Sequence, residues 1–288
     1  MTEIYAVIAQ LEKESYTVSS LCRTLGVSRS AYYGWRTNSC GMRRRRDLRL
    51  NPMIQSIFWE HHRRYGARRI AVELAVRGQC CSRRRVRRLM DEMGLVAIQP
   101  RTFKPRTTDS RHALGYSPNL LLSAASPDRI NQLWVGDITY VPLAAGDFLY
   151  LAMLMDRHSR RIVGWDLQDH MQELLVLRTL QAAIVSRQPS PDLIHHTDRG
   201  GQYAGTQYRQ LLHRARMKQS MSRANDCYDN AFMESCFGTL KTELEMTPYE
   251  NRHIAQKEVA QYIRYYNTHR RHSALGYLSP EAFESRSE

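Results

Sequence analysis

Hydrophobic residues recur every three or four positions through the first hundred residues, which is the spacing of helices packed on a core. Over residues 1–40 this pattern predicts one amphipathic helix followed by a helix–turn–helix unit, with Gly26 in the turn. Ser28 is predicted to cap the last helix, which ends near Trp35. A helical hairpin without a DNA role is the alternative for this segment.

A second helix–turn–helix unit is predicted over residues 47–98, and its last helix is expected to stop at Gly94. Its first helix is predicted from Leu48 to His62, behind a basic linker formed by residues 42–50. Residues 99–130 are rich in Pro, Arg, Thr and Ser, which predicts a linker between domains.

The pattern changes to strand-like runs from residue 131 onward. Three such runs are separated by short turns and predict hairpin-connected strands, at residues 132–143, 148–158 and 161–167. Helices and strands then alternate: a helix at 173–186, a strand at 191–198, a helix at 206–217, a strand at 218–222, and a helix behind it. Residues 131–250 are therefore predicted to form a mixed α/β sheet flanked by helices, followed by a helical segment over 251–288.

The positive charge of the chain is concentrated in its first part. The net charge is +14; residues 1–110 hold 22 Lys and Arg against 9 Asp and Glu, whereas residues 111–288 hold 20 against 19. Such a split predicts one part that binds nucleic acid and one part whose carboxylates have a role of their own. There is no apolar run of membrane-spanning length, no secretory signal, and no disulfide framework among the six cysteines, so we expect a cytoplasmic, nucleoid-associated protein.

Five arginines lie on the last predicted helix of the second helix–turn–helix unit: Arg83, Arg84, Arg85, Arg87 and Arg88. This density exceeds that of an ordinary solvated helix face and predicts contacts to DNA phosphates. Arg29, at the start of the corresponding helix in residues 1–40, is a further candidate DNA contact. A merely basic, soluble surface is the alternative.

Three carboxylates fall where a site could form. Asp137 lies inside a strand of apolar and aromatic residues, where a lone charge would be costly. Asp198 ends a strand just before two glycines, and sites gather at the carboxyl ends of strands in open α/β sheets. Glu234 lies on a later helix, beside an apolar stripe formed by Met233, Phe237, Leu240 and Leu244. Taken singly, each acid could instead be an ion-paired core residue, a turn residue or a solvated helix residue.

Convergence of these acids would create a defined chemistry. Neighbouring carboxylates raise one another's pKa, and a divalent cation relieves their repulsion. Oxygen ligands without thiols or paired histidines suit Mg²⁺, with Mn²⁺ as a substitute, and two such ions ~4 Å apart would clamp a scissile phosphate. Lys241 follows Glu234 by seven residues, about 10 Å along the same helix line, and is predicted to contact the DNA strand near the cut.

The spacing and the surrounding motifs resemble a known family. There are 60 residues between Asp137 and Asp198, and 35 between Asp198 and Glu234. Together with WVGDITY, HTDRGGQY and CYDNAFMESCFGTLKTE, they resemble the DDE catalytic core of retroviral-integrase-type transposases. More closely, the chain resembles the second-frame (OrfB) transposase of the bacterial insertion-sequence family numbered three. Residues 262–283 are similar to the C-terminal segment of that family.

The resemblance implies an RNase H-like fold, Mg²⁺ dependence and no organic cofactor. It implies hydrolytic nicking at the 3′ ends of an insertion sequence, then attack of the freed 3′-OH on another phosphodiester, through a circular DNA intermediate. It assigns Asp137, Asp198 and Glu234 as catalytic metal ligands and Lys241 as a DNA contact, with Asp229 and Asn230 shaping the start of the helix. Double-stranded DNA, a homo-oligomer on that DNA, and an upstream-frame (OrfA) partner or fusion are the expected partners.

Other functions fit parts of the pattern. A DNA-binding regulator with an inactive core would share the basic helices, and an RNase H-type nuclease would share the three acids; the two basic modules and the C-terminal segment favour transposition. A zinc-binding integrase N-terminal domain is excluded, because His61–His62 and Cys80–Cys81 are adjacent pairs. One group of residues in the C-terminal segment could either contact DNA or form an ordinary amphipathic helix: Tyr262, Tyr265, Tyr266, Arg270 and Arg271.

Overall fold

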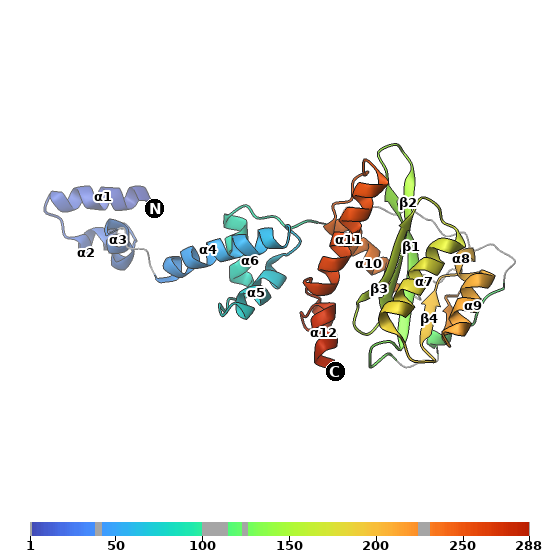
Figure 1. Ribbon diagram of the computed structural model, residues 1–288. Helices are drawn as coiled ribbons and strands as arrows, with labels where there is room; N and C mark the ends of the chain where they lie inside the picture. The colour runs from blue at the N-terminus through green and yellow to red at the C-terminus, as the bar shows by residue number, and fades with distance from the viewer. Residues whose placement is uncertain (1, 38–41, 100–114, 123–125, 224–230, 288) are drawn as a thin grey trace. The chain divides into compact units, whose positions relative to one another are not determined.

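The computed structural model describes residues 2–37, 42–99, 115–122, 126–223 and 231–287. The chain divides into two compact units, Met1–Ala97 and Ile98–Glu288. Figure 1 colours both units along the chain. None of the described helices combines the length and the apolar character that a membrane crossing requires.

The first three helices pack on one another as predicted for residues 1–40: α1 (Thr2–Lys13), α2 (Val18–Thr24) and α3 (Arg29–Arg36). They enclose a small core formed by Tyr5, Ile8, Val18, Cys22 and Tyr32. Gly26 has a positive φ of 65°, which suits the predicted turn. Ser28 stands at the cap position of α3, but its hydroxyl hydrogen-bonds that of Ser30 at 2.8 Å. Ser28 is thus the N-cap residue as predicted, although its side chain bonds the neighbouring hydroxyl and not a backbone N–H of the helix.

The next three helices also pack together: α4 (Met42–Glu60), α5 (Ala67–Val76) and α6 (Arg83–Glu92). The predicted basic linker over residues 42–50 is wrong, because α4 already begins at Met42. Asp47 supplies a physical reason, since its carboxylate pairs with Arg85 and Arg88 of α6 at 2.7 Å each. These ion pairs attach the basic stretch to α6. Gly94 has a positive φ of 66° just beyond α6, in line with the predicted stop.

The second unit is built on one five-stranded sheet with the order β3-β2-β1-β4-β5. Its strands are β1 (Leu133–Pro142), β2 (Phe148–Asp156), β3 (Ile162–Gln168), β4 (Ile194–Thr197) and β5 (Lys218–Met221). The first three pair antiparallel, whereas β4 runs parallel to β1 and β5 runs parallel to β4. The predicted fold class is confirmed: a helical helix–turn–helix region precedes an RNase H-like mixed sheet.

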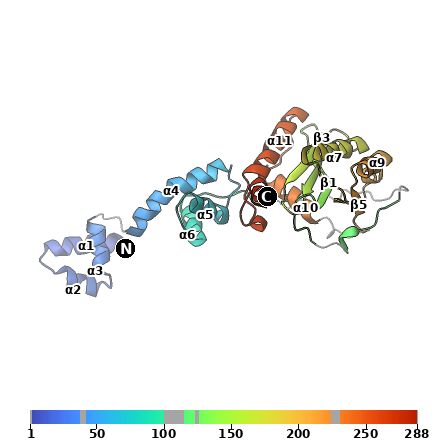
Figure 2. The same ribbon diagram turned by 60° about the horizontal axis from the view of Figure 1, so that its bottom comes forward.

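Helices cover both faces of this sheet (Figures 1 and 2). One face carries α7 (Glu173–Arg187), α8 (Gly201–Ala204) and α9 (Thr206–Arg214). The other carries α10 (Ala231–Glu243) and α11 (Arg252–Thr268). Strand alternation separates two cores, so that Trp134 of β1 faces the α7 side and Val135 faces the α10 side. The segment before β1 includes the short helix η1 (Leu120–Leu122), and Leu120 donates its backbone N–H to the Ser220 hydroxyl of β5 at 2.9 Å.

Of the five tyrosines and arginines left open in and just after α11, the structure places three in the core. Tyr262 and Tyr266 are buried against β-sheet residues. Arg270 is buried and forms an ion pair with Glu243 at the end of α10, where Tyr262 also donates its hydroxyl proton to the Glu243 carboxylate. Because these groups satisfy one another inside the protein, they hold α10 against α11.

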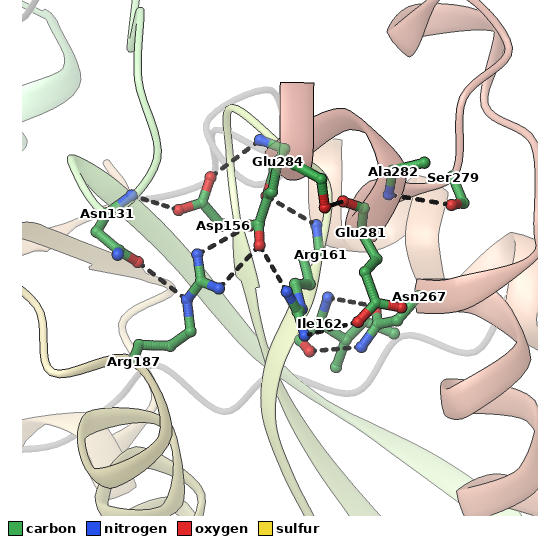
Figure 3. Close-up of polar contacts among 12 residues, drawn as sticks. Asn131, Asp156, Arg161, Ile162, Arg187, Asn267, Ser279, Glu281, Ala282 and Glu284 are labelled. Carbon is green, nitrogen blue, oxygen red and sulfur yellow. Dashed lines mark hydrogen bonds and ion pairs between the residues drawn. The ribbon is translucent and has the colours of Figure 1, made fainter. Parts of the chain in front are cut away.

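The C-terminal helix α12 (Pro280–Ser287), preceded by η3 (Ser273–Leu275), is tied to the sheet by ion pairs (Figure 3). Glu284 accepts hydrogen bonds from Arg161 at 2.6 Å and from two nitrogens of Arg187 at 2.8 Å each. Asn267 of α11 brackets the backbone of Ile162, accepting from its N–H and donating to its carbonyl. The start of β3 is thus fixed by two helices.

The Glu284 contacts predict an acid-sensitive contribution to stability. Burial would raise the pKa of the Glu284 carboxyl, but hydrogen bonds from Arg187, Ser159 and Arg161 hold this pKa below its ordinary value. A lowered carboxyl pKa contributes stability above the pKa of the unfolded chain, and this stability is lost as the pH falls through the folded pKa. Glu284→Gln should therefore cost about 3 kcal/mol of unfolding free energy at pH 7, and the cost should shrink toward pH 3, as measured by urea unfolding.

Glu281→Gln is the matched control, because Glu281 pairs with Arg161 at 3.7 Å and its side chain is 46% exposed. This exposed pair is expected to contribute less than about 1 kcal/mol. Equal losses in the two variants would contradict the proposed role of the buried carboxylate.

Candidate active site

Asp137 lies in the middle of the central strand β1. Its side chain shares the α10 face with Val135 and Val141, which are buried in the core on that side. Its Oδ1 accepts a hydrogen bond from the backbone N–H of Ile138 at 2.8 Å, which orients the carboxylate. Gly136 beside it is tightly packed: a Cβ there would lie 2.6 Å from Leu154 Cδ2. A larger residue at this position would force the Leu154 side chain to move.

Asp198 follows directly after β4. The parallel register pairs Val135 with His196, so two further residues along both strands bring Asp198 beside Asp137. Asp198 Oδ1 accepts a hydrogen bond from the backbone N–H of Gly200 at 2.9 Å. A Cβ at Gly200 would lie 3.0 Å from this same oxygen. The glycine therefore permits the close turn that was predicted after Asp198.

Glu234 lies in the first turn of α10 and is exposed. The helix faces β1 with the predicted stripe, of which Met233, Phe237 and Leu240 are buried; Leu244 lies beyond the end of α10 and is partly buried. The packing of this stripe fixes which side of α10 carries Glu234. Asp229 and Asn230, predicted to shape the helix start, lie outside the described residues.

The three acids interact electrostatically. Burial raises the pKa of Asp137 well above its ordinary value, the Asp198 carboxylate raises it further, and Glu234 adds a smaller effect in the same direction. The N–H of Ile138 and the Lys241 ammonium act in the opposite sense. Burial lowers the pKa of Lys241, while the charge of Asp137 partly offsets this. The structure therefore brings the three predicted acids and the predicted lysine into one region.

These side chains are neighbours but do not form a closed cage. Within the described ranges, no three His, Cys, Asp or Glu side chains are gathered closely enough to hold one metal ion. Asp137 on β1 and Asp198 just beyond the end of β4 form the inner pair, and Glu234 stands beside them on a helix that covers one face of the sheet. The donor set consists of carboxylate oxygens, which suits a hard divalent cation.

Tyr203 of α8 is a residue of this region that the sequence pattern did not single out. Its side chain is buried, and burial raises the pKa of its hydroxyl, with further contributions from Asp137 and Asp198. Its ring meets Tyr208 in a T-shaped arrangement at 5.5 Å. The signal was present in the sequence, because Tyr203 ends the HTDRGGQY motif, but a tyrosine behind a turn is equally typical of a core.

The histidines before Asp198 belong to the core. His195 Nε2 hydrogen-bonds the Tyr208 hydroxyl at 2.6 Å, and burial followed by the nearby His196 lowers the pKa of His195 to about 3. His196 hydrogen-bonds the hydroxyls of Ser220 and Ser222. Both rings are fully buried, so they hold β4 between its neighbours.

The five arginines of α6 divide into two groups. Arg85 and Arg88 are partly buried in the ion pairs with Asp47 described above. Arg83 and Arg84 are exposed in the first turn, and Arg87 is exposed near Asp91 at 3.9 Å. The exposed three are therefore better placed for phosphate contact than the paired two.

Arg29 is exposed at the first position of α3. It lines an open surface depression of about 720 Å³ at the starts of α2 and α3, together with Thr17, Ser19, Ser28 and Ser30. A basic residue among hydroxyl donors at helix starts is an arrangement that suits a phosphate.

Four family models match the chain. Two are described as "Integrase core domain" and cover residues 127–227 and 215–280. An "HTH-like domain" model matches residues 42–103, and a "Transposase" model of the helix–turn–helix type matches residues 2–56. Together they span both units.

Similar proteins come from bacterial insertion sequences. The chain is 41% identical over 268 residues to the "Insertion element IS600 uncharacterized 31 kDa protein" of Shigella sonnei, covering 92% of this chain and 98% of that protein. It is 36% identical over 284 residues to "Transposase InsF for insertion sequence IS3A" of Escherichia coli (strain K12), covering 97% and 98%. The chain belongs to the IS3 family of transposases. It is an InsF/OrfB-like transposase with an integrase core and helix–turn–helix domains, as the resemblance predicted.

The transposase is accordingly a DDE-type polynucleotidyl transferase, and DNA is its partner. Among solved structures, it is similar to the HTLV-2 integrase catalytic core domain in complex with magnesium (dimeric form), with a TM-score of 0.44 and 13% identity over 55% of this chain and 98% of that one.

The raised pKa of the partly buried Asp137 carboxyl predicts that the site reduces the stability of the transposase in EDTA. A carboxyl whose pKa is raised on folding destabilises the folded state as the pH rises through its titration. Asp137→Asn keeps the shape of the side chain and removes the charge. We expect a higher melting temperature at pH 7, by about 2–4 °C for each kcal/mol relieved, and a smaller difference at pH 5.

Asp147→Asn is the control, because Asp147 is exposed in the turn between β1 and β2. Its melting temperature should stay within about 1 °C of the wild type, as for most surface substitutions. A lower melting temperature for Asp137→Asn than for the wild type would show that the carboxylate stabilises the fold.

Proposed function

We propose that Asp137, Asp198 and Glu234 form the catalytic centre at which this transposase cuts and joins DNA. The observation that carries the proposal is the adjacency of Asp137 and Asp198 on parallel strands, which makes Asp198 the largest charge acting on the Asp137 carboxyl. Charge repulsion maintained inside a fold has a structural cost, and such sites are typical of catalysis. Glu234 completes the set from α10.

The same residues would hold Mg²⁺, with Mn²⁺ as a substitute, and we propose two ions per site. The fit rests on the donors, since carboxylates oriented by the backbone N–H groups of Ile138 and Gly200 are hard oxygen ligands. When bound, the ions would activate the attacking oxygen and stabilise the leaving oxygen. Lys241 would place its ammonium on the DNA strand beside Asp137.

Two reactions would follow at this one site. In the first, water attacks the phosphorus at the 3′ end of the element, the bond to O3′ breaks, and a free 3′-OH results. In the second, this 3′-OH attacks another phosphodiester, forms a new P–O bond and displaces the O3′ of that strand. Asp137 and Asp198 hold the reacting phosphate in the same orientation in both steps, because both steps are in-line displacements at phosphorus. A circular DNA intermediate is the proposed product of the joining step.

Assembly follows from the same chemistry. Two DNA ends must meet, so we propose a homo-oligomer on DNA, with an upstream-frame (OrfA) partner or fusion adding further end recognition. A bacterial cytoplasmic, nucleoid-associated location is proposed for the same reason.

Neutralising any one of the three acids should abolish both reactions. Asp137→Asn, Asp198→Asn and Glu234→Gln are each expected to reduce cleavage and joining of terminal-repeat DNA by at least about 1,000-fold, while DNA affinity in EDTA stays within about threefold. Asp147→Asn controls for loss of a surface charge. Purified proteins are assayed with Mg²⁺, and with and without an in-frame upstream extension.

The DNA products distinguish a transposase from a nuclease and from a regulator. Joined DNA that vanishes in Glu234→Gln supports the proposed transposition chemistry. Wild-type cutting without joining would point to a nuclease, and tight binding with neither product would point to a regulator.

The exposed arginines of α6 are proposed to bind phosphates. Arg83→Ala combined with Arg84→Ala should reduce the slope of log K against log salt by about 1.8, since each lost phosphate contact contributes about 0.9. Arg85→Ala is the contrasting variant, because it breaks an ion pair with Asp47. It should lower the melting temperature and leave the salt slope close to that of the wild type. An unchanged slope in the double variant would remove this helix face from the DNA interface.

A further inference from the structure

The turn between β2 and β3 is basic and partly buried, and its backbone is held by several hydrogen bonds. Asp156 is fully buried, and its carboxylate accepts hydrogen bonds from the backbone N–H groups of His158, Ser159 and Asn131. The Asp156 backbone also pairs with Arg160 and Arg161, which closes the turn. Arg160 has a positive φ of 61°, a strained conformation for a residue with a side chain, which the surrounding bonds hold in place.

The arginines of this turn have different surroundings. Arg161 points to α12, where Glu284 and Glu281 balance its charge, as Figure 3 shows. Arg157 and Arg160 instead reach α10, and their guanidinium carbons lie 3.4 Å and 4.2 Å from the centre of the Phe232 ring. Phe232 precedes Glu234 by two residues on the same helix.

Arg157 and Arg160 carry two positive charges into a partly buried place. Burial and then the neighbouring Arg160 lower the pKa of Arg157 to about 10. Across the described residues, neither guanidinium group forms a hydrogen bond or an ion pair with another side chain, in contrast to Arg161. Stacking on a ring leaves the in-plane N–H donors of an arginine available.

Two such donors beside each other match one kind of ligand. Two positive charges held close together in a partly desolvated place repel each other, and a bound anion relieves this repulsion. Arginine binds phosphate through paired N–H donors. Both arginines contact the first turn of α10, the helix that also carries Glu234 on another side. We infer that Arg157 and Arg160, oriented by Phe232, bind a backbone phosphate of the DNA.

This inference rests on the proposed function of the same site, and a phosphate-by-phosphate scan tests it. Terminal-repeat DNA is prepared with one neutral methylphosphonate at a time, at each phosphate near the cut. Affinity is measured by fluorescence anisotropy in EDTA, where no reaction occurs, for full-length wild type and for a variant carrying Arg157→Gln and Arg160→Gln. At one or two positions the neutral linkage should weaken the wild type about tenfold and the variant less than about twofold.

The control is Arg178→Gln, since Arg178 is exposed on α7, a helix of the opposite sheet face. Its pattern across the scan should match the wild type. A folding defect would lower affinity at all positions alike, and the single variant Arg157→Gln repeats the scan if the double variant is too unstable to bind.

An identical pattern in wild type and variant would overturn the inference, and the two arginines would then only hold Phe232 in place. If the wild type joins DNA but no neutral linkage weakens its binding, this inference is wrong and the proposed function still stands. A wild type that neither cuts nor joins defeats the proposed function, whatever the scan shows.

Discussion

The parallel pairing of β1 with β4 is the constraint on which the site depends. It brings Asp137 and Asp198 together from positions 61 residues apart in the chain, inside a sheet where their charges repel. Gly136 and Gly200 lie beside the two aspartates in close packing, and a Cβ at either position would force a neighbouring side chain to move. The fold thus maintains an unfavourable pair of carboxylates, and the rest of the second unit compensates for that cost.

The compensation comes from two networks around the sheet. At one end of α10, buried Glu243 pairs with Arg270 and accepts a bond from Tyr262. At the other end, Phe232 lies under the arginines of the β2–β3 turn, which Asp156 and the C-terminal helices keep in place. The helix that carries Glu234 is therefore held at both ends by residues distant from it in sequence. Local unfolding of this helix would separate Glu234 from the aspartates, so its rigidity is a condition of the proposed chemistry.

Much of this could be predicted from the sequence. The order of strand-like and helical runs predicted the fold class. Strand alternation in β1 and the apolar stripe of α10 predicted the faces of Asp137 and Glu234, because both patterns report burial directly. The helical state of residues 42–50 could not be predicted in this way, since it depends on Asp47 meeting Arg85 and Arg88 of another helix. The pairing of Arg270 with Glu243, and the stacking of Arg157 and Arg160 on Phe232, are likewise long-range contacts that no local pattern contains. For the same reason, the sequence could not separate the paired arginines of α6 from the exposed ones.

The central claim is that the paired aspartates hold a divalent cation against the phosphate that is cut. A substrate with sulfur replacing a non-bridging oxygen at the scissile phosphate tests this claim most directly, because Mg²⁺ binds sulfur poorly and Mn²⁺ accepts it. For one of the two phosphorothioate diastereomers, the account predicts cleavage that is strongly reduced in Mg²⁺ and restored in Mn²⁺, with unmodified DNA cut in both. Equal cleavage of the modified and unmodified DNA in Mg²⁺, for both diastereomers, would contradict it.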